Sequence, residues 1–152
     1  MILKKMTDIF SKQKRSEIMS KISGKETKPE ILARKFLFAN GFRFRKNDKR
    51  YPGKPDIVLP KYKTVIFVHG CFWHGHNCPA GKLPETRKEF WEAKINGNIE
   101  RDKRKKSELE KQGWQVITIW ECELKNKKTQ ERTLKRLIDT LHNNVYKALG
   151  NM

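Results

Sequence analysis

The sequence has no long apolar run. Its most hydrophobic stretch, around Thr64–Val68, is far shorter than the about 20 residues that a membrane-spanning helix needs. The first residues, Met1–Asp8, lack the apolar region and the small-residue cleavage site of a signal peptide. We therefore expect a protein that neither crosses nor lies on a membrane and that is located in the cytoplasm.

Acidic residues are scarce relative to basic ones. The chain has 17 Asp and Glu against 35 Lys and Arg, a net charge of +18, and its mean hydropathy is −0.84. Solubility alone needs a net charge of only about 2 to 8 on a small domain, so the excess indicates a polyanionic partner. No basic stretch also carries the wide apolar face of an interfacial helix, which favours nucleic acid over an anionic membrane.

The length of 152 residues suits one domain, which can bury roughly two thirds of its unfolded surface. Apolar spacing and turn residues predict helices and strands that intermingle without internal repeats. The expected elements are a basic N-terminal arm or helix (1–24), a helix from Thr27 to Asn40–Gly41, strands at Phe42–Arg45, Ile57–Leu59, Thr64–Val68 and Trp114–Trp120, a charged helix at Thr86–Gln112, and an amphipathic helix (129–150). We expect a single α/β domain, 1–152, with helices flanking a mixed sheet.

Cysteine is limited to three residues, an odd number that argues against a disulfide framework and favours thiols or a metal. Cys71, His76, Cys78 and Cys122 match the thiolate and imidazole donors of closed, tetrahedral zinc sites. Because Cys122 directly follows an expected strand, a shared ion would pin that strand to the Cys71–Cys78 loop. The spacing is not a standard double CxxC pattern, His74 competes for the fourth position, and ordinary buried cysteines are the alternative.

A second cluster of candidates lies between two expected strands. Asp56 begins one strand and His69 ends the next, an arrangement with which nucleases hold Mg²⁺ against a phosphate, although Pro55-Asp56 also suits a simple turn. Two aromatic pairs, Phe72-Trp73 in a polar loop and Phe90-Trp91 in a basic helix, suit core packing by default. Bulky rings on a basic surface can also wedge into base stacks.

Several runs of residues together resemble a known protein family. They are Val65–His74 (Val-Ile-Phe-Val-His-Gly-Cys-Phe-Trp-His) with Cys78, Thr86-Arg87, Glu89–Trp91, Asn98–Asp102, Gly113-Trp114 and Trp120–Cys122. Together they closely resemble the very-short-patch repair (Vsr) endonuclease family, over about Lys14 to Cys122. The resemblance implies a fold like that of type II restriction endonucleases. It also implies nicking of duplex DNA on the 5′ side of the T in a T·G mismatch left by deamination of 5-methylcytosine.

The resemblance also implies catalytic residues. Asp56 would bind a catalytic Mg²⁺ together with the backbone carbonyl of Val68, a position where a relative carries Thr. His69 would stabilise the phosphate and His74 would act as the base, since an imidazole exchanges protons near neutral pH. Glu30 would lie near the active site, although its capping-box spacing after Thr27 explains it as well. The restriction-nuclease motif has a second acidic residue and a Lys. At the corresponding positions this sequence has Phe67 and His69, so it departs from that motif.

The remaining implied roles concern zinc and DNA. The resemblance assigns the four Cys and His residues to structural Zn²⁺, which leaves His74 free for catalysis. The implied DNA contacts are Met19, Phe72, Trp73, Trp91, Lys94 and Asn98. We expect a prokaryotic, nucleoid-associated monomer that acts on T·G duplexes, with mismatch-repair proteins and DNA polymerase I as further candidate partners. Two alternatives are a non-catalytic, zinc-stabilised DNA-binding protein and a nuclease of the same fold with another DNA substrate.

Overall fold

A four-stranded mixed sheet lies at the centre of the computed structural model, which describes residues 27–150, with side chains up to residue 144. The predicted arm at 1–24, with Met19, lies outside the described residues. The strand order is β1-β2-β3-β4, with bounds β1 Arg45–Lys46, β2 Ile57–Leu59, β3 Thr64–His69 and β4 Gln115–Trp120. β1 and β2 are antiparallel, as are β2 and β3, whereas β3 and β4 are parallel.

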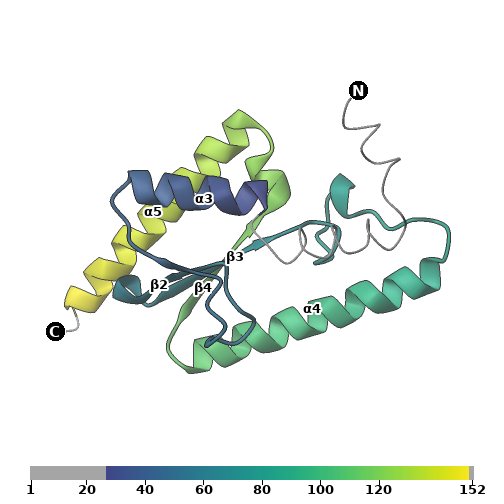
Figure 1. Ribbon diagram of the computed structural model, residues 1–152, viewed down its shortest axis with the longest axis horizontal. Coiled ribbons are helices and arrows are strands. Elements are labelled where there is room, and N and C mark those ends of the chain that lie inside the picture. Colours follow the sequence, from purple (N-terminus) through teal and green to yellow (C-terminus); the bar gives the residue numbers. More distant parts are fainter. Residues whose placement is uncertain (1–26, 151–152) are drawn as a thin grey trace, which may run out of the picture.

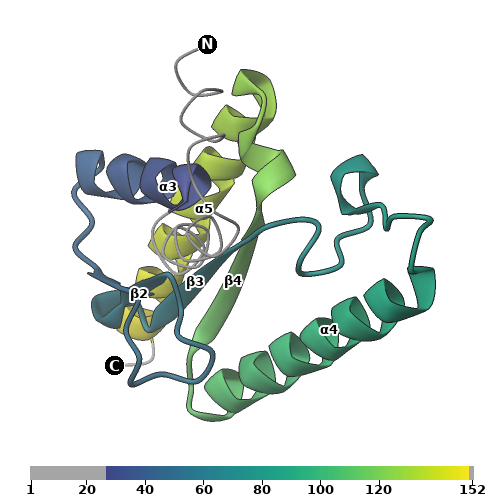
Figure 2. The ribbon, with the colours of Figure 1, turned by 45° about the vertical axis from the view of Figure 1, so that its right-hand side comes forward.

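Helices cover both faces of this sheet. α3 (Lys28–Ala39) and α5 (Lys127–Gly150) pack together on one face, and α4 (Lys88–Lys111) lies against the other, as Figures 1 and 2 show. α4 also forms the crossover between the parallel strands β3 and β4, and its N-terminal half extends beyond the sheet (Figure 2). The predicted class, a mixed α/β domain with flanking helices, is therefore confirmed.

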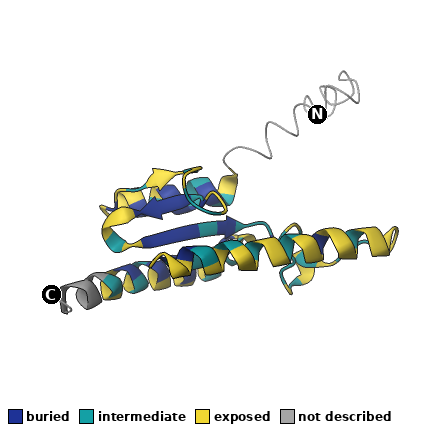
Figure 3. Cartoon of the chain, turned by 90° about the horizontal axis from the view of Figure 1, so that it is seen from below, coloured by how far each residue is buried: buried dark blue, intermediate teal, exposed yellow. Residues whose placement is uncertain are grey.

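The apolar strands are buried on both faces because they alternate between two cores. Ile66 and Val68 of β3 pack towards α3 and α5, in a core that includes Leu37, Leu134 and Leu141. Val65 and Phe67 face the opposite way, towards Leu109 of α4 and Trp114. Strands covered on both sides read as continuous apolar runs, which explains the unbroken Val-Ile-Phe-Val sequence. Figure 3 shows the strands mainly buried and the helices exposed along their outer sides.

The predicted strand at Phe42–Arg45 is wrong in its extent, since strand pairing is confined to Arg45–Lys46. The reason is the end of α3: the Phe42 N–H donates to the Leu37 carbonyl and the Gly41 N–H to that of Phe38, the two bonds of a Schellman motif. Gly41 adopts φ +87°, as this motif requires. Phe42 is therefore held at the helix end, and its ring packs into the core beside Tyr62.

The longer helices agree with their predictions. The charged helix predicted at Thr86–Gln112 is α4, Lys88–Lys111, and the amphipathic helix predicted at 129–150 is α5, Lys127–Gly150. Among the described residues, no helix combines the length and the apolar character needed to cross a membrane.

Candidate active site and metal cluster

The site residues gather where β3 and β4 end. Because these strands are parallel and His69 lies opposite Trp120, the segments that follow them leave the sheet at the same edge. The loop after β3 carries Cys71, His74, His76 and Cys78. The 3₁₀ turn after β4, η3 (Glu121–Leu124), carries Cys122.

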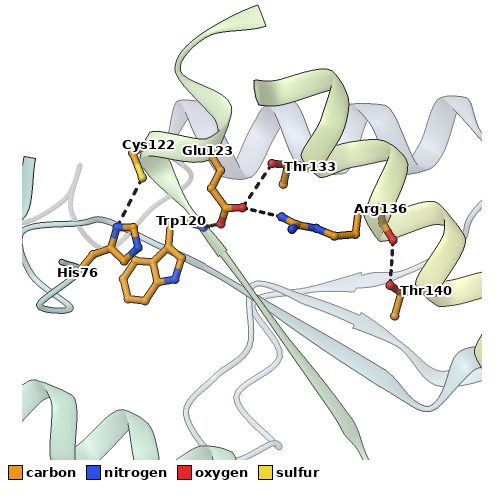
Figure 4. Close-up of polar contacts among 7 residues, drawn as sticks. All are labelled: His76, Trp120, Cys122, Glu123, Thr133, Arg136 and Thr140. Carbon is orange, nitrogen blue, oxygen red and sulfur yellow. Dashed lines mark hydrogen bonds and ion pairs between the residues drawn. The ribbon is translucent and has the colours of Figure 1, made fainter. Parts of the chain in front are cut away.

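The three cysteines and His76 form one cluster. One ligand atom from each of Cys71, His76, Cys78 and Cys122 lies within 4.8 Å of the others, and Cys122 Sγ is 3.5 Å from His76 Nδ1 (Figure 4). Burial and the neighbouring sulfurs raise the pKa of Cys122 to about 12. A cation would favour the thiolates, and three thiolates with one imidazole are a donor set of structural zinc sites. The residues therefore fit a structural metal.

Close backbone packing maintains this cluster. A Cβ on Gly81 would overlap the His76 carbonyl oxygen, so only glycine fits at that position. The His76 ring stacks on Trp120, with centroids 4.1 Å apart and an interplanar angle of 11°. Trp120, the last residue of β4, thereby packs against the Cys/His cluster.

Glu123 fixes the turn that carries Cys122 (Figure 4). Its Oε1 accepts the Trp120 N–H at 3.0 Å, and its Oε2 accepts bonds from Thr133 Oγ1 at 3.3 Å and Arg136 Nη2 at 2.9 Å. One carboxylate thus ties the end of β4 to α5, so the position of Cys122 depends on the α5 side of the molecule as well as on the loop.

A pocket of about 700 Å³ lies beside the Cys/His cluster and is lined by residues that include Glu30, Asp56, His69 and His74. Asp56 Oδ2 accepts the Val68 N–H at 2.7 Å, a bond that joins the start of β2 to β3. Burial raises the pKa of Asp56 well above its ordinary range, and the nearby Glu30 carboxyl adds to this effect. Two carboxyl groups that share a partly buried site favour a bound cation.

Val68 presents its backbone to Asp56, while its side chain packs into the core under α3 and α5. A hydroxyl at this position would lie on the core side. The Val68 side chain is thus compatible with a metal contact made through the backbone carbonyl alone.

Glu30 has both features that its sequence position suggested. Its backbone N–H donates to Thr27 Oγ1 at 3.4 Å, so Thr27 caps α3. Its carboxylate is buried, lies 3.5 Å from Arg34 Nη2, and lines the pocket near Asp56. The first turn of α3 therefore delivers a carboxylate to the site.

The two histidines of the pocket stack on each other. The rings of His69 and His74 are parallel within 3°, with centroids 3.7 Å apart. Burial, reinforced by the charge of His74, lowers the pKa of His69 to about 4. A neutral His69 can donate one hydrogen bond and accept another at neutral pH.

Asp102, in the middle of α4, is the residue of the site that sequence reasoning missed. Its Oδ2 lies 2.7 Å from His74 Nδ1, an ion pair if His74 is protonated. The signal was its place in the Asn98–Asp102 run, which carried the family resemblance without an assigned role. The contact spans 28 positions in the chain, which explains why no local pattern revealed it.

The aromatic residues form a partly exposed cluster at the start of α4. The rings of Phe72, Trp73 and Trp91 lie 5.1 to 5.9 Å apart, and Trp73 is 52% exposed. Asn98 Nδ2 donates to the Trp73 carbonyl at 2.9 Å and so holds the loop against α4. Lys94 is exposed on the same helix.

Cations line the wall of the pocket that α4 forms. Arg101, Lys103, Lys105 and Lys106 contribute to it, and Lys54 contributes from the loop before β2. This wall attracts phosphate groups, and it lies next to the carboxylates and imidazoles that can do chemistry on them.

Comparison with known proteins agrees with this geometry. Residues 7–80 match the model of the family described as DNA mismatch endonuclease Vsr. The chain is 62% identical to the type II nicking enzyme V.NmeAIP of Neisseria meningitidis serogroup A, over 88% of this chain and 95% of that protein. It is 43% identical to the DNA mismatch endonuclease Vsr of Escherichia coli K12, over 87% of this chain and 86% of the relative.

A third relative, the type II nicking enzyme V.XorIIP of Xanthomonas oryzae, is 44% identical over 88% of this chain and 98% of its own length. The family-model match, residues 7–80, includes Glu30, Asp56 and the Cys71–Cys78 loop. The resemblance seen in the sequence is confirmed, and the chain belongs to the Vsr family of DNA mismatch endonucleases, whose fold is restriction-endonuclease-like.

Proposed function

We propose that this protein nicks duplex DNA at mismatches, on the 5′ side of the T in a T·G pair that arises from deamination of 5-methylcytosine. The observation that carries the proposal is one basic pocket that holds Asp56, His69 and His74 beside an exposed aromatic cluster. The names of the relatives, mismatch endonuclease and nicking enzyme, support the reaction class. The choice of T·G and of the 5′ bond follows from the family resemblance.

Asp56 is proposed to hold Mg²⁺ together with the backbone carbonyl of Val68. Oxygen donors suit this hard cation, and the raised pKa of Asp56 indicates a carboxylate that a cation would stabilise. When bound, Mg²⁺ polarises the phosphoryl oxygens and lowers the pKa of a coordinated water. Glu30 adds negative charge on the same side and orients the Asp56 region through the first turn of α3.

His74 is proposed to take the proton from the attacking water. Its Nδ1 lies against Asp102, which fixes the ring and leaves Nε2 as the proton acceptor. Asp102 acts through His74 and is therefore a positioning residue. His69, stacked on His74, contacts the phosphate and stabilises the charge that develops there.

The aromatic cluster is proposed to read the mismatch. Phe72, Trp73 and Trp91 insert beside the mispaired base, which costs a few kcal/mol of unstacking that ring contacts must offset. Lys94 contacts the DNA near the mismatch, while Asn98 holds the Trp73 backbone. Met19, proposed to wedge from the other groove, lies outside the described residues. Zn²⁺ at Cys71, His76, Cys78 and Cys122 maintains the loop that presents these rings.

The cellular setting is part of the same proposal. The protein acts as a monomer in the nucleoid of a prokaryotic cell, and mismatch-repair proteins and DNA polymerase I are the candidate partners that would process its nick. The high positive charge supports DNA as the direct partner.

A panel of labelled duplexes tests the proposal. Duplexes with T·G, the other mismatches or no mismatch are incubated with the protein and Mg²⁺, and the nick position is mapped on each strand. We expect nicking of T·G alone, 5′ of the T. Nicking of another structure would favour a nuclease of the same fold with a different substrate, and binding without nicking would favour a non-catalytic DNA-binding protein.

A further inference from the structure

Three side chains of the pocket have the arrangement of a metal site distinct from the Cys/His cluster. His69 at the end of β3, His74 in the loop and Asp102 of α4 each offer a ligand atom within 4.8 Å of the other two. Tetrahedral bonds of about 2.0 to 2.2 Å place ligand atoms roughly 3.3 Å apart. Because the His69 and His74 rings stack in parallel, at least one ring must turn before both can aim a nitrogen at a shared ion. The side chains of His74 and Asp102 are 30% and 31% exposed, which leaves room for such rotations.

The donor set selects the type of ion. Two imidazoles and one carboxylate suit Zn²⁺, Co²⁺ or Ni²⁺, whereas Mg²⁺ prefers oxygen donors such as Asp56 and a backbone carbonyl. The site opens onto the pocket, so its fourth position is available to water or to a phosphate oxygen. This differs from the four protein donors of the Cys/His cluster, which close their own tetrahedron.

We propose that His69, His74 and Asp102 bind a transition-metal ion of the Zn²⁺ class, and that this ion blocks nicking. An ion shared with Asp102 binds His74 on its Nδ1 side, which leaves the proton on Nε2, so the ring can no longer accept a proton there. The same ion takes up a nitrogen with which His69 would contact the phosphate. The same pocket then responds oppositely to two metals: Mg²⁺ activates it and Zn²⁺ inhibits it. The inhibition rests on the proposed nuclease function, but the metal binding does not.

Direct binding tests the site without reference to activity. The purified full-length protein is dialysed against micromolar free Zn²⁺, and bound zinc is counted by elemental analysis. We expect one equivalent more in the wild type than in Asp102→Asn or His69→Asn. Removing a group that hydrogen-bonds to a metal ligand typically weakens metal binding by about 10- to 100-fold. Removing a ligand itself should weaken zinc binding by more than this.

Two control variants locate the extra equivalent. His142→Asn removes an exposed histidine that stacks on Phe42, far from the pocket in the α5 layer, and should retain it. Asp56→Asn removes the proposed Mg²⁺ ligand and should also retain it. Equal zinc content in the wild type and Asp102→Asn, or loss of the equivalent in Asp56→Asn alone, would overturn the proposed site.

The inhibition is measured as nicking of a T·G duplex at saturating Mg²⁺ while free Zn²⁺ is raised. We expect activity to fall with the same midpoint as the extra equivalent binds, in both the wild type and His142→Asn. Undiminished nicking with the site filled would overturn the inhibitory role. If the protein without added Zn²⁺ nicks no duplex, the proposed function fails, while the dialysis still decides whether the metal site exists.

Discussion

At the residue scale, three histidines of the site differ in their neighbours. His69 is buried and its pKa is lowered to about 4, whereas His74 is more open and contacts the Asp102 carboxylate. His76 lies with the cysteines instead, stacked on Trp120. The same residue type thus meets three different environments within eight positions of the chain, which matches the three roles that we propose for it.

The contact between Asp102 and His74 predicts the effect of Asp102→Asn. The amide retains the shape of the carboxylate but cannot stabilise a protonated imidazole, so part of the about 10²- to 10⁴-fold contribution of a general base should be lost. We expect a slower single-turnover nicking rate at saturating DNA, with DNA affinity unchanged. Asp139→Asn, an exposed carboxylate on α5, serves as the control. Equal rates for both variants would remove Asp102 from the mechanism.

We expect Trp73 to contribute to mismatch recognition and not to general DNA binding. Its ring is half exposed in a cluster with Phe72 and Trp91, and no basic group is lost when it is truncated. Trp73→Ala should therefore reduce the preference for T·G over matched duplex, while the salt dependence of binding to matched DNA stays the same. Competition gel shifts at several salt concentrations measure both quantities. An unchanged preference would indicate that Trp73 only packs.

At the element scale, Gly81 is tightly packed and Gly97 is not, so the same substitution at both positions tests the packing of the loop. A Cβ on Gly81 meets the His76 carbonyl, so Gly81→Ala should destabilise the protein by at least the about 1 to 3 kcal/mol typical of overpacking. A Cβ on Gly97, within α4, meets nothing within 4 Å, so Gly97→Ala should stabilise by about 0.5 to 1 kcal/mol. Urea unfolding measures both. Effects of the same sign would contradict the packing described for the loop.

The Cys/His cluster joins two elements, and its metal should therefore support folding. Cys122 anchors the turn after β4 to the loop after β3, and a structural ion stabilises the folded state by its binding free energy. The wild type should contain one tightly held Zn²⁺ per chain, and Cys122→Ser should lower both zinc content and thermal stability. Active protein without zinc would refute this assignment.

Most elements could be predicted from local patterns, because their signals lie within a few residues of each other. The Thr27 cap, the apolar runs of β2 and β3 and the glycine after α4 are examples. The strand at Phe42–Arg45 could not be placed correctly, because the Schellman motif competes for Phe42. The pairing of Asp102 with His74 depends on how α4 packs across the sheet edge, and no local pattern encodes that distance.

At the scale of the whole molecule, the parallel strands β3 and β4 bring the functions together. Both strands end at one edge, where the Cys/His cluster adjoins the pocket that contains Asp56, His69 and His74. The net charge of +18 favours binding to DNA, but Lys and Arg are protonated at neutral pH and cannot act as bases. We therefore expect binding and cleavage to rest on different residues.

The most direct measurement of this account compares binding and nicking of one labelled T·G duplex by the wild type and Asp56→Ala. The variant should bind the duplex as tightly as the wild type or slightly more tightly, because a negative charge near the phosphates is removed. Its Mg²⁺-dependent nicking, followed under single-turnover conditions, should fall to background. Nicking by Asp56→Ala at the wild-type rate would contradict the proposed active site.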